Sequence, residues 1–74
     1  MNLLDLRHVP CPVNLVRSRL YLQKQPPGSQ VLIWLDQGDP LASVPGGLAA
    51  VGHRILETRY PDSDTAQILV EVKA

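Results

Sequence analysis

The chain has a single cysteine, no excess of charge and no long apolar run. One cysteine excludes an intramolecular disulfide, and together with only His8 and His53 it cannot complete a four-ligand zinc site without acidic ligands. The longest apolar run, Val31–Leu35, is too short to span a bilayer, and no basic and apolar leader follows Met1. We therefore expect a cytoplasmic protein with no membrane segment, no metal and no other cofactor.

Small size and electrical neutrality narrow the functional classes further. The 74 residues carry seven basic and seven acidic side chains, and 45% of them are apolar. Such a composition is typical of a globular protein, and a chain of this length forms one compact domain, here residues 1–74. Because no net positive charge is available to hold phosphates, we expect no direct binding of nucleic acid.

Local patterns predict the order strand, helix, strand, helix, strand, strand. The predicted strands are Leu3–Arg7, Gln30–Asp36, His53–Tyr60 and Ala66–Lys73, and the predicted helices cover residues 12–25 and 39–51. Pro45 and the two glycines after it predict that the second helix is kinked or in two parts. Two helices can cover only one face of four strands, so the expected fold is an α/β two-layer sandwich of βαβαββ order, a mixed sheet with one open face.

Cys11 lies between two prolines at the predicted start of the first helix. Pro12 suits the first helical position, which makes Cys11 the N-cap residue. The first turn of a helix has unpaired N–H groups and a partial positive charge, so the amides of Val13 and Asn14 are expected to stabilise a Cys11 thiolate. The alternative is a buried and unreactive cysteine, as many lone cysteines are.

The surroundings of Cys11 in the sequence disfavour a hydrolase. His8, three residues before it, is a candidate base or positive neighbour, although a turn histidine without a catalytic role is the simpler interpretation. No third residue that would orient a histidine and no oxyanion loop can be recognised. A thiolate without that machinery can still exchange sulfur with a disulfide or a persulfide.

At these residues the chain resembles the TusA/SirA family of small sulfur-carrier proteins. The family hallmark is a short strand ending in Asp-Leu-Arg-Gly, followed by Cys-Pro-x-Pro at the start of a helix, and here the segment 5–14 reads DLRHVPCPVN. The resemblance continues at Pro27-Gly28, Asp39-Pro40, Val44-Pro45 and Gly52-His53.

The resemblance implies a βαβαββ sandwich in which Cys11 carries a persulfide from a donor enzyme, such as a cysteine desulfurase, to an acceptor protein. Pro12 matches the first motif proline, and Asp5 and Arg7 match the Asp-Leu-Arg segment, which places Arg7 among the residues that support the thiolate. Two positions depart from the family pattern. His8 stands where glycine is usual, and Asn14 stands where the second proline is usual, so it retains an N–H that could add a hydrogen bond to the sulfur.

Two apolar stripes run along the first predicted helix. Leu15 and Leu22 form one stripe, and Val16 and Leu20 form the other. One stripe must face the sheet. We expect the other to pack on the second helix, and the alternative is that it lies exposed as part of a docking surface.

A candidate partner surface combines basic and apolar residues. Arg17 and Arg19 make the exposed side of the first helix basic, which is either an ordinary solvated face or a surface that steers an acidic partner. If Val31, Ile33 and Leu35 face the helices, Leu32 and Trp34 emerge on the open face of the sheet. With Leu69 or Ile55 they would form an apolar patch for homodimerisation or partner docking.

Two functions other than sulfur transfer remain open at this point. The chain could be a non-catalytic interaction module that works through Trp34 and its neighbours, or a redox-responsive thiol protein that forms an intermolecular disulfide through Cys11.

Overall fold

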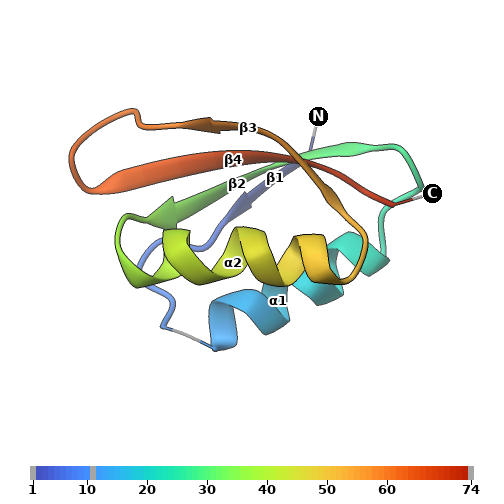
Figure 1. Ribbon diagram of the computed structural model, residues 1–74, viewed down its shortest axis with the longest axis horizontal. Helices are drawn as coiled ribbons and strands as arrows, with labels where there is room; N and C mark the ends of the chain where they lie inside the picture. The colour runs from blue at the N-terminus through green and yellow to red at the C-terminus, as the bar shows by residue number, and fades with distance from the viewer. Residues whose placement is uncertain (1, 11, 74) are drawn as a thin grey trace.

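The structure, a computed structural model, describes residues 2–10 and 12–73. Its elements are β1 (Asn2–Asp5), α1 (Val13–Gln23), β2 (Gln30–Asp36), α2 (Asp39–Ala50), β3 (Arg54–Arg59) and β4 (Thr65–Glu71). Both helices lie on the same side of the sheet, so the predicted two-layer α/β sandwich is confirmed (Figure 1). Within the described ranges, no helix is long and apolar enough to cross a membrane.

The sheet is mixed, with the strand order β1-β2-β4-β3. Strands β1 and β2 are parallel, whereas β4 is antiparallel to both β2 and β3. Because β1 and β2 run in the same direction, their carboxyl ends lie at one end of the molecule. Helices α1 and α2 both begin at that end and both finish at the other (Figure 1).

The core is formed by the alternating side chains of the two central strands. Every second residue of β2 is fully buried, as are the residues opposite them on β4: Val31, Ile33, Leu35, Ala66, Ile68 and Val70. Leu32 and Trp34 have the opposite parity and lie on the face that no helix covers. The structure therefore meets the condition under which Leu32 and Trp34 emerge on the open face.

The face that helix α1 buries coincides only in part with its apolar stripes, since it contains Leu22 but also two polar residues. Its buried residues are Asn14, Ser18 and Leu22, which are spaced by one turn. Leu15 faces α2, since a β-carbon on Gly47 would lie 2.7 Å from either Cδ atom of its side chain. The expectation that the other stripe packs on α2 is wrong, because Leu15 occupies that place and Val16 and Leu20 stay exposed.

Helix α2 is one element from Asp39 to Ala50, although Pro45 lies inside it. Of the two alternatives, a kinked helix or one in two parts, the second is therefore wrong. Val44 and Leu48 are both fully buried and stand one turn apart on either side of the proline amide. Their burial holds the two halves of the helix to the same core despite the hydrogen bond that Pro45 cannot donate.

The two leucines of α1 provide a matched test of which face is buried. Leu22→Ala is expected to lower the free energy of unfolding by about 2–5 kcal/mol, because it opens a cavity in the core. Leu20→Ala, at a position that is 53% exposed, is expected to change it by less than about 0.5 kcal/mol. Urea unfolding of both variants measures the difference, and equal losses would contradict the described packing.

Candidate functional site

The segment between β1 and α1 lies at the end of the sheet where the two parallel strands finish (Figure 1). Cys11 itself lies outside the described residues, but the residues on both sides of it are described. The stretch before it faces the β2–α2 turn across an open groove lined by His8, Val9, Pro10, Asp36, Gln37, Asp39 and Pro40. The chain that precedes the cysteine is thus fixed against the end of β2 and the start of α2.

Hydrogen bonds to β2 hold this stretch in place. The Leu6 amide donates to the carbonyl oxygen of Trp34 at 2.8 Å, and the His8 amide donates to Oδ2 of Asp36 at 2.7 Å. The Val9 amide donates back to the Leu6 carbonyl oxygen at 3.2 Å, and the Leu6 side chain is buried. The path toward the cysteine is therefore determined by β2 as well as by β1.

His8 takes the backbone conformation that glycine prefers. Its φ is 66°, the one positive φ among the described non-glycine residues. Its side chain is 89% exposed, with Nδ1 3.9 Å from Oδ1 of Asp36. The positive φ agrees with the glycine that is usual at this position in the family that the sequence resembles. The histidine side chain fits because it points into solvent, and the bond from its amide to Asp36 holds the left-handed turn.

The start of α1 differs by one residue from the sequence prediction. The helix begins at Val13, and Pro12 is its N-cap residue, so the prediction that Cys11 is the N-cap and Pro12 the first helical residue is wrong. The Asn14 amide donates to the Pro10 carbonyl oxygen at 3.1 Å, so it is engaged with the backbone and is not a free donor for a thiolate. No described residue accepts a hydrogen bond from the Val13 amide.

The Asn14 side chain is fully buried at the same turn. Its Oδ1 accepts a hydrogen bond from the Leu15 amide at 2.7 Å, while its Nδ2 has no partner among the described residues. A buried amide nitrogen without an acceptor lowers the stability of the fold, because it has lost its hydrogen bonds to water. The sequence predicted a role for the Asn14 main-chain amide, whereas in the structure it is the buried side-chain nitrogen of Asn14 that lacks an acceptor.

Arg7 is directed to the open face of the sheet. Its guanidinium forms two hydrogen bonds with the Asp5 carboxylate, at 3.0 and 2.8 Å, and lies 4.8 Å from the ring centroid of Trp34. These bonds, together with one from the Arg7 amide, lower the pKa of Asp5 to about 2. The charge of Arg7 is thus paired on the face opposite the helices.

The apolar patch on the open face is present, with one correction. Leu32 and Leu69 are direct cross-strand neighbours on that face, beside Trp34. Ile55 packs against the core instead, so its inclusion in the patch is wrong. Its strand, β3, is irregular between Ile55 and Glu57, and this irregularity sets which of its side chains face the core. The indole Nε1 of Trp34 is buried and has no partner within the described chain.

A second apolar surface follows the outer side of α1. Val13, Val16 and Leu20 are 41%, 51% and 53% exposed. They are spaced by about one turn and start two residues after Cys11, and Arg17 lies among them. The spacing of these residues was visible in the sequence, but only the structure shows which stripe is left uncovered.

The fold is shared with solved SirA-like structures. A crystal structure of the SirA-like protein from Desulfitobacterium hafniense superposes with a TM-score of 0.82 at 16% identity, covering 100% of both chains. A solution structure of a Helicobacter pylori protein gives a TM-score of 0.80 at 19% identity, again over 100% of both chains. This likeness defines the class as an α/β sandwich of the SirA-like type.

Sequence comparison narrows that class. A model of the family described as "Sulfurtransferase TusA" matches residues 2–72. A protein of Thermotoga maritima named "Putative sulfur carrier protein" is 30% identical over 70 residues, which is 95% of this chain and 89% of that protein. The chain therefore belongs to the TusA sulfurtransferase family, and the resemblance found in its sequence is confirmed.

The conformation of His8 leads to a stability prediction. His8→Gly is expected to raise the free energy of unfolding by about 0.5–1 kcal/mol, because glycine adopts a φ of 66° without strain. His8→Ala keeps the strain and is the matched control, with a change near zero. Denaturant unfolding of the three proteins tests this, and a gain in the alanine variant equal to that in the glycine variant would contradict it.

The Asp5–Arg7 pair leads to a pH prediction. The pKa of Asp5 is depressed in the folded state, so the pair stabilises the fold above the unfolded pKa of about 4, and that contribution is lost as the pH falls toward 2. A carbon-detected NMR titration of the Asp5 carboxyl should show a midpoint near 2.

Arg7→Gln should raise the midpoint of Asp5 toward about 4, the ordinary value for aspartate, although the main-chain amide of residue 7 still donates to the carboxylate. Arg17→Gln removes an arginine that makes no ion pair with a described residue, and it should leave the midpoint unchanged. A midpoint that stays near 2 in Arg7→Gln would show that another group holds the pKa of Asp5 down.

Proposed function

We propose that this chain is a cytoplasmic sulfur carrier that holds a persulfide on Cys11 and passes it from a donor protein to an acceptor protein. The observation that carries the proposal is the sulfurtransferase family match over residues 2–72, which spans the Cys-Pro motif. The start of α1 supports it, because a helix beginning leaves N–H groups and a partial positive charge beside the cysteine.

The transfer is a thiolate exchange that needs no external oxidant or reductant. The Cys11 thiolate attacks the terminal sulfur of a donor persulfide, R–S–SH. A bond forms between the Cys11 sulfur and that sulfur, the donor S–S bond breaks, and the donor leaves as the thiolate R–S⁻. The second transfer repeats this chemistry, with an acceptor thiolate attacking the Cys11 persulfide and Cys11 leaving.

The groups around the cysteine suit such an exchange. Among the described residues, the Val13 amide and the Asn14 side-chain nitrogen are the donors near the motif that lack an acceptor. Hydrogen bonds from these groups would favour an ionised sulfur. The Asn14 main-chain amide donates its hydrogen bond to the Pro10 carbonyl oxygen, so it is not available to the sulfur, contrary to the sequence prediction.

The exposed side of α1 is a suitable surface for the donor and acceptor proteins. Val13, Val16 and Leu20 offer an apolar strip that begins beside the motif, and Arg17 adds positive charge within it. An apolar strip with a basic residue favours a partner whose own surface is apolar and acidic. A cysteine desulfurase is the type of donor that we propose.

A second candidate function is a non-catalytic interaction module. The observation that favours it is the uncovered patch of Leu32, Trp34 and Leu69, which lies on the face of the sheet opposite the helices. A second copy of the chain or another protein could cover this patch without contact with the cysteine.

The sulfur-carrier proposal is tested by intact mass. After incubation with a desulfurase and cysteine, the chain should gain the mass of one sulfur atom, and the gain should disappear on treatment with a reductant. Cys11→Ser should gain nothing. No gain in the natural chain, or the same gain in Cys11→Ser, would overturn the proposal.

The second function is tested by substitution of Trp34 and of Cys11 in a binding assay. If the chain is an interaction module, Trp34→Ala should abolish self-association or partner binding and Cys11→Ser should not. If it is a sulfur carrier that docks through α1, Leu20→Ala should slow sulfur loading and Trp34→Ala should leave the loading rate unchanged.

A further inference from the structure

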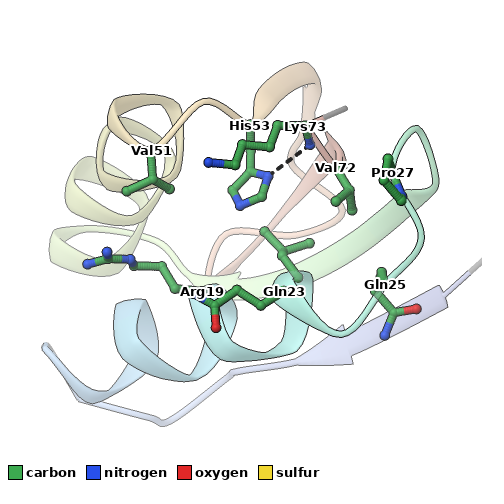
Figure 2. Close-up of a pocket in the computed structure, with 9 residues that line it drawn as sticks. Arg19, Gln23, Gln25, Pro27, Val51, His53, Val72 and Lys73 are labelled. Carbon is green, nitrogen blue, oxygen red and sulfur yellow. Dashed lines mark hydrogen bonds between the residues drawn. The ribbon is translucent and has the colours of Figure 1, made fainter.

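A pocket of about 290 Å³ lies at the opposite end of the molecule from the cysteine motif. The second halves of α1 and α2 converge there with the end of β4 (Figure 2). The residues that line it are Arg19, Leu22, Gln23, Gln25, Pro27, Val51, His53, Val72 and Lys73. Its volume is at the lower end of the range for small-molecule sites, about 300–1,000 Å³.

None of the described ionisable residues that line this pocket is acidic. They are two cations, Arg19 and Lys73, and one histidine, His53, with no aspartate or glutamate among the described lining residues. Neither cation forms an ion pair with a described residue, whereas Arg7, Arg54 and Arg59 are each paired with a carboxylate. Positive charge is therefore concentrated here without a counter-charge from the described residues, in a chain whose formal net charge is zero.

His53 is held as a hydrogen-bond donor to the pocket. It is 7% exposed, and its Nδ1 accepts a hydrogen bond from the Lys73 amide at 3.1 Å. An amide can only donate, so Nδ1 carries no proton and the proton of the neutral ring is on Nε2. Figure 2 shows this second nitrogen directed into the space between His53 and α1.

Lys73 is held over the same space by its stem. A β-carbon on Gly52 would lie 3.0 Å from Cδ of Lys73, so the lysine stem runs against the glycine backbone. Gly52 has a φ of 101°, which a larger residue would adopt only with strain. In Figure 2 the ammonium end of Lys73 lies beside the His53 ring, with Arg19 across the pocket on α1.

The two cations are not needed to satisfy the carbonyl groups at the ends of the helices. Both helices end at this pocket, and carbonyl groups there carry partial negative charge. The carbonyls of Leu22, Leu48 and Ala49 already accept backbone hydrogen bonds from the residues that follow each helix. Among the described residues, the Arg19 and Lys73 side chains form no hydrogen bond with any of these groups, so both are available to a ligand.

We propose that this pocket binds a small organic anion, with its charged group held by Arg19, Lys73 and Nε2–H of His53. Its apolar part would lie against Pro27 and Val51, the apolar lining residues that are exposed and half-buried, respectively. The side-chain amide of Gln23 would add a polar contact at the rim. The proposal does not depend on Cys11 or on sulfur transfer.

Binding of the anion and protonation of the His53 ring must be thermodynamically linked. Burial, Lys73 and Arg19 together lower the pKa of His53, so the ring is neutral at pH 7. Lys73 and Arg19 are the charged groups that line the pocket with it, and Val51 of the α2 end is uncharged. An anion beside the ring favours its protonated form, so a ligand should raise the pKa of His53 and bind more tightly as the pH falls.

The experiment is an NMR titration of the His53 ring with benzoate, and with benzamide as the uncharged analogue, at constant ionic strength. Benzoate should give saturable shifts at His53 and raise its pKa, and benzamide should give neither. Arg19→Gln and Lys73→Gln should each weaken benzoate binding about tenfold, because each removes a charge-assisted contact. Arg17→Gln, an arginine of the same helix that does not line the pocket, should leave binding unchanged.

Cys11→Ser should bind benzoate as the natural chain does, which separates this site from the sulfur-carrier proposal. Shifts that do not saturate, that are equal for benzamide, or that survive in the Arg19→Gln, Lys73→Gln double variant would overturn the proposal. Circular dichroism of each variant verifies that a loss of binding is not a loss of fold.

Discussion

Strand β2 is the part of the structure on which the rest depends. It is paired with β1 on one side and β4 on the other, and its helix-facing side chains are fully buried. Its last three residues also hold the motif, because the Trp34 carbonyl oxygen accepts a hydrogen bond from the Leu6 amide and the Asp36 carboxylate accepts one from the His8 amide. A change that shifted β2 by one residue would therefore exchange the two faces of the sheet and release the cysteine segment together.

The parts of the fold that sequence predicts well are those with a regular pattern. The alternation of β4 indicates which of its sides faces the helices, and the prolines and glycines mark where elements end. The run of β2 is apolar on both sides, so its orientation was left open by the sequence. Helix α1 was harder, because its buried face contains Asn14 and Ser18, which hydrophobic periodicity does not select. The Ser18 hydroxyl is satisfied within the helix by the Leu15 carbonyl, so a polar residue can be buried there.

The chemistry of the site was predictable where it rests on local sequence. A cysteine between prolines at a helix start is visible without a structure, and so is the family resemblance that the comparisons confirm. The direction of Arg7 was not predictable, because it depends on Trp34, a residue 27 positions away that β-pairing brings beside Asp5. The pocket at His53 was also missed, since its lining comes from both helices, the α1–β2 turn and the end of β4, and no local motif marks it.

Trp34 is the one tryptophan of the chain, and Arg7 lies over its ring. Indole emission depends on the polarity and charge close to the ring, so the fluorescence of this protein originates at the base of the cysteine segment. Arg7 is followed directly by His8, and the Trp34 carbonyl holds Leu6. The molecule thus contains its own optical reporter, which needs no label and is sensitive to the position of the segment that leads to Cys11.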